Sequence, residues 1–358
     1  MIQNRFIAIV KKTFRLRKVF LLQALMPPSF YSERIYDKRY KKAAVRGLFA
    51  VLMIMAGFSM GLGAQGYSAE RSLKVALLPI LDTFPFYVAE AQGYFDRYGV
   101  AVTAVPVGSG LERDQLMQSG AIDGMLNEMA STANFNREGI QVRIISSARK
   151  AYPHYPLFRI LAAPGSNLTA PADLKGIPIG ISRNTIIEYV TDRLMVAGGL
   201  SPDQVVKKSV PVIPERYQLL LQRQLKAATL PDPLAKSALE AGAGAVIDDS
   251  AHPQYSVSVL SFHLDAIQAK AEAVRQFLKA WNHAVQDINA NPESFRSLLL
   301  QKIRVPKNIQ QTYRIPPFPR REVPSAAQWA DVMNWMVSKG LLNAPIPYKD
   351  SVTNEFLP

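Results

Sequence analysis

Apolar runs alternate with helix-like segments from residue 70 to the end of the chain. The run at residues 73–78 ends at Pro79 and predicts a buried strand, and residues 86–94 place apolar side chains at helical spacing. Further strand-like runs lie at 100–105, 122–126 and 142–146. This alternation predicts an α/β fold with a parallel, doubly wound sheet and right-handed crossovers.

A second series follows residues 149–156, whose two prolines and two tyrosines predict a connector. Strand-like runs lie at 157–163, 177–181, 227–230 and 245–247. Thr185 and Glu188 have the spacing of a capping box, so a helix is expected to begin at Thr185. Three more helices are expected, at 265–289, 292–302 and 325–339.

The N-terminal segment resembles an export signal. Residues 47–69 carry no charge, basic residues precede them, and small residues follow at their end. This order is typical of a secretory signal peptide, with cleavage after Ala64 or Ala69. A retained single-span anchor is the alternative, because the uncharged stretch is just long enough to cross a bilayer. Residues 1–69 are therefore left out of the fold.

Composition narrows the possible chemistry. The chain has no cysteine, which excludes disulfides, thiolate zinc sites, iron–sulfur clusters, a cysteine nucleophile and a lipid-modified cysteine. Residues 1–69 hold 12 of the 42 basic residues and two of the 28 acidic ones, so most of the +14 net charge lies there. The remainder carries too little excess charge for a nucleic-acid-binding surface. The four histidines lie far apart, so no metal site is expected.

Candidate binding residues follow the predicted strands, because ligands of doubly wound sheets bind beyond the carboxyl ends of the strands. No catalytic residues are identified. The candidate ligand-binding residues are Asp82, Thr83, Phe84, Ser109, Gly110, Asn127, Glu128, Arg183, Asn184, Thr185 and Asp232.

Two of these loops suggest an anion site. Ser109-Gly110 and residues 182–185 each open a helix, where free backbone N–H groups attract anions, and Arg183 would add a charge-assisted hydrogen bond. The alternative is that Ser109 and Thr185 are ordinary helix caps. Phe84 is expected to line a pocket because Pro85 extends its loop, whereas Asn127 fits a cap as well as a ligand contact.

Four motifs, in order over about residues 73–300, carry a family resemblance: FYVAEAQGYF at 86–95, MQSGAIDG at 117–124, ADLKGIPIG at 172–180 and ATLPDPLA at 228–235. Together they resemble the substrate-binding proteins of ABC importers for nitrate, sulfonates, taurine and thiamine precursors.

The resemblance implies a type II periplasmic-binding fold with two doubly wound lobes. Lobe 1 would comprise residues 70–150 and 255–358, including the C-terminal helices, and lobe 2 would comprise residues 151–254. Crossovers would lie near 149–157 and 249–257.

The implied function is capture of a small anionic or heteroaromatic solute by hinge closure, without cofactor or catalysis. The implied setting is a periplasmic monomer that serves a permease and its ATPase. Two alternatives remain: a membrane-tethered sensory module, or a fold-related enzyme of thiamine-pyrimidine or menaquinone precursor metabolism. An enzyme of the first kind uses a cysteine-rich motif, which this chain lacks, and one of the second kind is cytoplasmic, which an export signal opposes.

Overall fold

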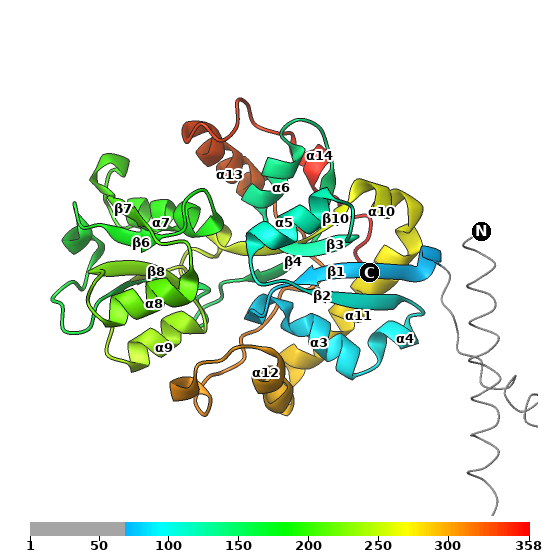
Figure 1. Cartoon of the computed structure of the whole chain (residues 1–358), viewed down its shortest axis with the longest axis horizontal. Coiled ribbons are helices and arrows are strands. Elements are labelled where there is room, and N and C mark those ends of the chain that lie inside the picture. The colour runs from blue at the N-terminus through cyan, green and yellow to red at the C-terminus, as the bar shows by residue number, and fades with distance from the viewer. Residues whose placement is uncertain (1–68) are drawn as a thin grey trace, which may run out of the picture. The chain divides into compact units, whose positions relative to one another are not determined.

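A computed structural model describes residues 69–358, which contain two five-stranded sheets flanked by helices (Figure 1). In the first sheet the order is β2-β1-β3-β10-β4. Its strands are β1 (Ser72–Leu77), β2 (Ala101–Pro106), β3 (Gly124–Glu128), β4 (Val142–Lys150) and β10 (Val257–His263). β1 pairs in parallel with β2 and β3, whereas β10 runs antiparallel to both β3 and β4.

The second sheet has the order β7-β6-β8-β5-β9. Its strands are β5 (Phe158–Ala162), β6 (Ile179–Ile181), β7 (Lys207–Ser209), β8 (Ala227–Pro231) and β9 (Gly244–Asp248). β6 pairs in parallel with β7 and β8, whereas β5 is antiparallel to β8 and β9.

The α/β fold with two crossover segments is confirmed, but neither sheet is purely parallel as the alternation predicts. Residues 151–157 connect β4 to β5, and residues 249–256 connect β9 to β10. Each crossover delivers the chain to the new sheet at the edge where the parallel strands end. The incoming strands β5 and β10 therefore run against their neighbours.

Helices cover both sheets. Those before β10 are α3 (Phe84–Ala91), α4 (Tyr94–Arg97), α5 (Gly110–Gln118), α6 (Met129–Asn136), α7 (Ile186–Ala197), α8 (Ile213–Leu221) and α9 (Leu234–Glu240). Those after β10 are α10 (Leu264–Ala269), α11 (Ala271–Ala290), α12 (Arg296–Lys302), α13 (Ala326–Ser338) and α14 (Tyr348–Ser351). Short 3-10 turns used below are η3 (Leu81–Thr83), η6 (Pro253–Tyr255) and η8 (Lys307–Ile309).

Local signals set several helix boundaries. Thr185 caps α7 by accepting a hydrogen bond from the Ile187 amide at 3.1 Å, so the helix begins where the capping pattern predicts. The capping box itself is not formed, because Glu188 Oε2 accepts from the Asn184 amide instead. The expected helix at 265–289 is instead two helices, α10 and α11, because the backbone leaves helical geometry at Lys270 (φ −128°, ψ 32°).

The C-terminal helices adjoin the first sheet, and one of them, α13, also contacts a helix of the second sheet. The amphipathic helix α11 buries Phe277 and Trp281 against α3, α4 and β1. α14 packs on β4, and α13 packs on α6, so all three adjoin the first sheet. α13 also reaches the second sheet's helices, because its Asp331 pairs with Arg193 of α7 at 2.8 Å.

The predicted leader, residues 1–69, lies outside the described residues except for Ala69. Among the helices described for residues 69–358, none is both long and apolar enough to span a bilayer.

Gly124 tests the packing of the first sheet. The ring of Phe262 on the neighbouring β10 lies so close that a Cβ on Gly124 would come within 2.6 Å of it. Both residues are buried, so Gly124→Ala should lower the free energy of unfolding by about 1–3 kcal/mol. Chemical denaturation measures this. Gly244→Ala in β9 is the control, because its Cβ would meet its nearest neighbours at an ordinary 3.7 Å. An equal effect of both substitutions would contradict the packing described.

Candidate functional site

Three of the predicted site residues, Asp82, Glu128 and Asp232, lie where strands of the two sheets end. Asp82 follows β1, Glu128 ends β3, and Asp232 follows β8 of the second sheet. Asp82 accepts a hydrogen bond from Arg149 Nη1 at 3.0 Å, and both side chains are nearly buried. Burial alone would lower the pKa of the Arg149 guanidinium, but the charges of Asp82 and Asp232 raise it above its usual range.

Asp232 joins the same network from the second sheet. It forms an ion pair with Arg159 of β5, and the Tyr313 hydroxyl donates a hydrogen bond to its Oδ2 at 3.1 Å. Burial and the neighbouring carboxylate of Asp232 raise the pKa of Tyr313 well above its ordinary value. These residues form one ion cluster that includes side chains from both sheets: Asp82, Arg149, Arg159, Asp232 and Tyr313.

A very small hollow, with a cavity volume of about 10 Å³, lies between the first turns of α6 and α7. Its lining residues come from both halves of the chain: Glu128, Met129, Ala130, Ile186, Tyr189, Tyr255, Val257 and Val332. The rings of Tyr189 and Tyr255 meet edge to face, with centroids 6.3 Å apart. The hollow is therefore apolar and aromatic, with one charged side chain, Glu128.

Glu128 connects this hollow with the ion cluster. Desolvation raises the pKa of its carboxyl group, the nearby Asp114 and Asp82 raise it further, and Arg113, whose Nη1 lies 3.6 Å away, opposes the shift. A carboxyl group with a raised pKa facing an apolar hollow can accept a hydrogen bond when ionised and donate one when protonated.

Three predicted residues serve the interior of the first sheet. Asn127 is buried, donates to Thr132 Oγ1 at 3.0 Å and accepts from Ser261 Oγ at 2.8 Å. Thr83 Oγ1 donates to the Ile80 carbonyl at 2.7 Å. The expectation that Phe84 lines a pocket is wrong: Phe84 is a fully buried core residue at the start of α3 and is absent from the hollow's lining.

Ser109 and Gly110 form a cap. Ser109 Oγ accepts from the Glu112 amide at 3.2 Å, and Glu112 Oε2 accepts from the Gly108 amide at 2.7 Å. Because Glu112 already places a negative charge at this helix start, the alternative reading as an ordinary cap describes these contacts best.

The second predicted anion loop is also occupied by local contacts. The Asn184 amide donates to Glu188 Oε2 at 2.7 Å, and Thr185 Oγ1 donates to the Ser182 carbonyl at 2.9 Å. Arg183 is exposed, and its Nη2 lies 3.4 Å from the Lys207 carbonyl in edge strand β7. Arg183, Asn184 and Thr185 thus do not join Asp82, Glu128 and Asp232.

The sequence analysis does not identify several of the site residues. Arg149 and Arg159 could have been found from the sequence, because they lie in buried strands, where a guanidinium requires an acidic partner. Tyr313 lies in a proline-rich link, and Tyr189 and Tyr255 read as ordinary packing residues. Within residues 69–358, no group of three or more His, Asp or Glu side chains is arranged to hold a metal ion.

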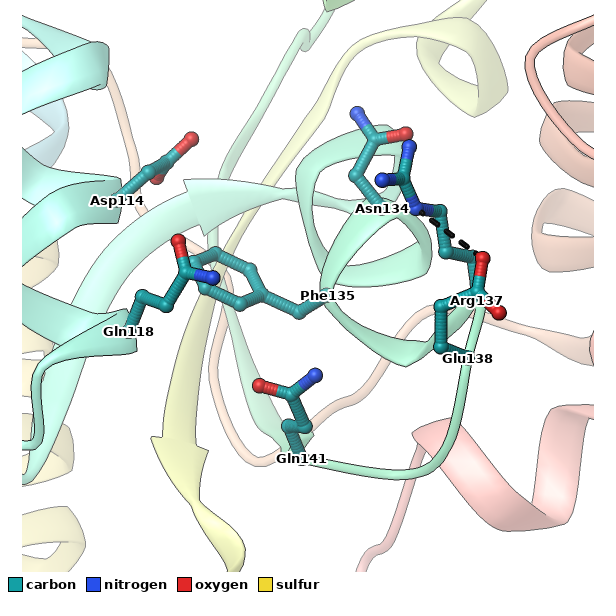
Figure 2. A pocket seen from close by; sticks show the side chains of 7 residues that line it. All are labelled: Asp114, Gln118, Asn134, Phe135, Arg137, Glu138 and Gln141. Carbon is teal, nitrogen blue, oxygen red and sulfur yellow. Dashed lines mark ion pairs between the residues drawn. The ribbon is translucent and has the colours of Figure 1, made fainter.

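A larger hollow of about 290 Å³ lies at the ends of α5 and α6 (Figure 2). Asp114 and Gln118 come from α5, Asn134 and Phe135 from α6, and Arg137, Glu138 and Gln141 from the following loop, with Arg137 and Glu138 paired at 3.7 Å. All of these residues belong to the first sheet's side of the molecule. This open, polar hollow is therefore not formed between the two sheets.

Asp249 ties the two crossovers together. Its carboxylate is fully buried and accepts hydrogen bonds from the amides of Leu157 and Phe158, both at 2.9 Å. Burial raises the pKa of this carboxyl group to about 6 against the opposing effect of these hydrogen bonds, and Asp248 adds to the rise.

The chain matches a known protein family over more than half of its length. The family model "NMT1/THI5 like" matches residues 81–295, which include every strand of the two sheets except β1. The chain belongs to the NMT1/THI5-like family.

This chain is similar to curated proteins at low sequence identity. It is 22% identical over 321 residues to the riboflavin-binding protein RibY of Chloroflexus aurantiacus, covering 82% of this chain and 88% of that protein. It is 25% identical over 265 residues to a protein of Brachyspira hyodysenteriae named as an ABC transporter periplasmic binding protein, covering 71% and 75%.

Solved structures share the fold. The alkanesulfonate-binding protein SsuA of Xanthomonas axonopodis pv. citri, bound to MOPS, superposes with a TM-score of 0.64 at 17% identity, covering 79% of this chain and 98% of that one. The desulfurization enzyme DSZB also matches, with a TM-score of 0.57 at 15% identity, covering 80% and 97%. The neighbours are mostly transport binding proteins, and some are enzymes.

Asp249 yields a pH-dependent prediction. Its pKa is raised on folding, so the protonated form is favoured in the folded state, and its contribution is complete at low pH and lost as the pH rises through about 6. Between pH 4 and 7 the free energy of unfolding should fall relative to Asp249→Asn by on the order of 3 kcal/mol. Denaturant titrations across this range measure the difference. Parallel pH profiles of the two proteins would show that Asp249 does not titrate as described.

Proposed function

We propose that this family member is the extracytoplasmic solute-binding component of an ABC importer. The observation that carries the proposal is that strand ends of both sheets place polar side chains close together: Asp82 and Asp232 in the ion cluster, and Glu128, whose pKa responds to the charge of Asp82, at the apolar hollow. Pockets of this fold class lie at strand carboxyl ends and between domains, which supports solute capture there.

The capture mechanism is a hinge closure. Residues 70–150 with 255–358 form one lobe, residues 151–254 form the other, and the crossovers tied by Asp249 act as the hinge. A solute that contacts both lobes favours the closed arrangement by its additional contacts there. The hollow, at about 10 Å³, is far smaller than a usual ligand pocket, so opening is needed to admit a solute.

The solute is small and anionic or heteroaromatic. Tyr189 and Tyr255 offer aromatic faces and edges for a flat ring, and Glu128 offers a hydrogen-bonding group at its rim. The names of similar proteins support this range, since RibY is named for riboflavin and SsuA for alkanesulfonates.

The proposed setting follows from the same role. The protein acts as a periplasmic monomer, exported by the segment at 47–69, and delivers its solute to a membrane permease driven by an ATPase. It needs no cofactor and catalyses no reaction. DSZB supports the alternative of an enzyme on this fold, and retention of residues 47–69 would support a membrane-tethered module.

Native purification followed by mass spectrometry of released small molecules tests the proposal. A stoichiometric small molecule, rebinding unchanged after removal, is the expected result. Conversion of that molecule to a product would favour the enzyme, and the absence of any bound or rebinding solute would contradict solute capture.

Glu128→Gln tests the site itself. Replacing the carboxylate acceptor by an amide removes a charge-assisted hydrogen bond from a ring N–H of a heteroaromatic solute, so the Kd for the released solute should rise about tenfold, equivalent to about 1.4 kcal/mol. Calorimetric titration measures the change. Glu112→Gln, at the exposed start of α5, is the matched control and should leave the Kd unchanged. If Glu128→Gln also leaves it unchanged, the hollow is not the binding site.

A further inference from the structure

The two sheets repeat one strand order. β1, β2, β3 and β4 correspond to β6, β7, β8 and β9, and the incoming strands β10 and β5 occupy the same place in each sheet. The central pairings are parallel in both, and the incoming strands are antiparallel in both. Helix α5 connects β2 to β3 as α8 connects β7 to β8, so these two helices are equivalent.

Each of the equivalent helices carries a buried arginine as its fourth residue: Arg113 in α5 and Arg216 in α8. Their exposed fractions are 5% and 0%. Arg113 donates to the carbonyl of Leu126, the third residue of β3, at 3.2 Å, and Arg216 donates to that of Thr229, the third residue of β8, at 2.9 Å. The two arginines are therefore internal counterparts.

The two arginines differ in the number of carboxylates that lie close to their guanidinium groups. Arg113 lies 2.7 Å from an Asp114 carboxylate oxygen and 3.6 Å from one of Glu128. Arg216 has no carboxylate within 4.0 Å among residues 69–358, unlike the other two buried arginines, Arg113 and Arg149. Burial without an acidic partner lowers the pKa of Arg216 to about 10, so it still carries its charge at neutral pH.

Some of the N–H donors of the Arg216 guanidinium have hydrogen-bond partners, and others do not. Nη1 donates to Ser182 Oγ at 2.9 Å and to the Val210 carbonyl at 2.6 Å, whereas Nη2 has no hydrogen-bond partner. Gly180 leaves room for this side chain, since a Cβ there would lie 3.3 Å from Arg216 Cδ. A buried, unpaired charge is costly to maintain, so a site arranged around one indicates a function for that charge.

The position of the Arg216 guanidinium in the fold favours a role in solute binding. Ser182 and Val210 follow β6 and β7, so the guanidinium lies at the carboxyl edge of the second sheet. Ser182 also begins the loop into α7, whose first residue, Ile186, lines the hollow between the sheets. Glu128, which also lines that hollow, lies 3.6 Å from the equivalent arginine, Arg113, whose nearer carboxylate is that of Asp114 at 2.7 Å.

We propose that Arg216 is a specificity-determining residue that supplies the positive charge for an acidic group of the solute, of the sulfonate, carboxylate or phosphate type. The inference rests on the proposed solute-binding function and adds the group that distinguishes an anionic solute from a neutral one. Nη2 is the donor left for the anion, and because this atom is buried in the structure, opening of the lobes is needed for the anion to reach it.

Ethanesulfonate and its uncharged analogue ethyl methyl sulfone are the probes, titrated into the full-length protein by calorimetry. The natural protein is expected to bind ethanesulfonate at least tenfold more tightly than the sulfone. Arg216→Met should abolish this preference while leaving the sulfone affinity unchanged. Arg183→Ala is the matched control, because this exposed arginine lies beside the same loop, and it should keep the preference.

A preference retained by Arg216→Met, or absent from the natural protein, overturns the inference. Circular dichroism checks that the variant folds. If it does not, Arg216→Lys, which keeps the charge but loses the planar fork, takes its place and should reduce the preference at least threefold; an unchanged preference overturns the inference. If the natively bound solute proves uncharged, the role of Arg216 fails while solute binding stands.

Discussion

The chain passes between its two sheets twice, and the carboxylate of Asp249 holds these passages together through the amides of Leu157 and Phe158. The edge at which each crossover enters its sheet determines the direction of β5 and β10. It also brings the loops after β1, β3 and β8 toward one region, where Asp82, Glu128 and Asp232 lie. The site therefore depends on a buried acid that itself lies in the connection rather than in the site.

The ion cluster around Arg149 contains two aspartates and two arginines, so its formal charges cancel. Such a complete buried cluster adds little net stability, whereas removal of one partner costs about 3–5 kcal/mol. Each ion pair lies within one sheet, and the charge of Asp232 acting on Arg149 links the two pairs. α13 makes a second bridge, because Trp335 Nε1 donates to Asp192 of α7 at 2.9 Å while the helix packs on α6.

Short-range patterns predicted the elements well, and long-range electrostatics could not be read from them. Apolar runs located β1 and β8, and the spacing of Thr185 and Glu188 located the start of α7. The resemblance supplied both crossovers, whereas alternation alone predicted parallel sheets. Phe84 was misassigned because a proline-extended loop and a helix start with proline in its first turn look alike in one sequence. The equivalence of Arg113 and Arg216 follows from topology, and the sequence marks it only by a short shared pattern, E-R-x-Q-L, at 112–116 and 215–219.

The central claim is that two lobes close on a solute, and a distance across them tests it most directly. Leu111 on α5 and Val212 before α8 are 71% and 55% exposed, and the chain has no native cysteine, so Leu111→Cys with Val212→Cys gives two unique spin-label sites. Pulsed electron paramagnetic resonance measures the distance between the labels before and after the natively bound solute is returned. The account predicts a shorter and narrower distance distribution with solute. A distribution that solute leaves unchanged would contradict closure.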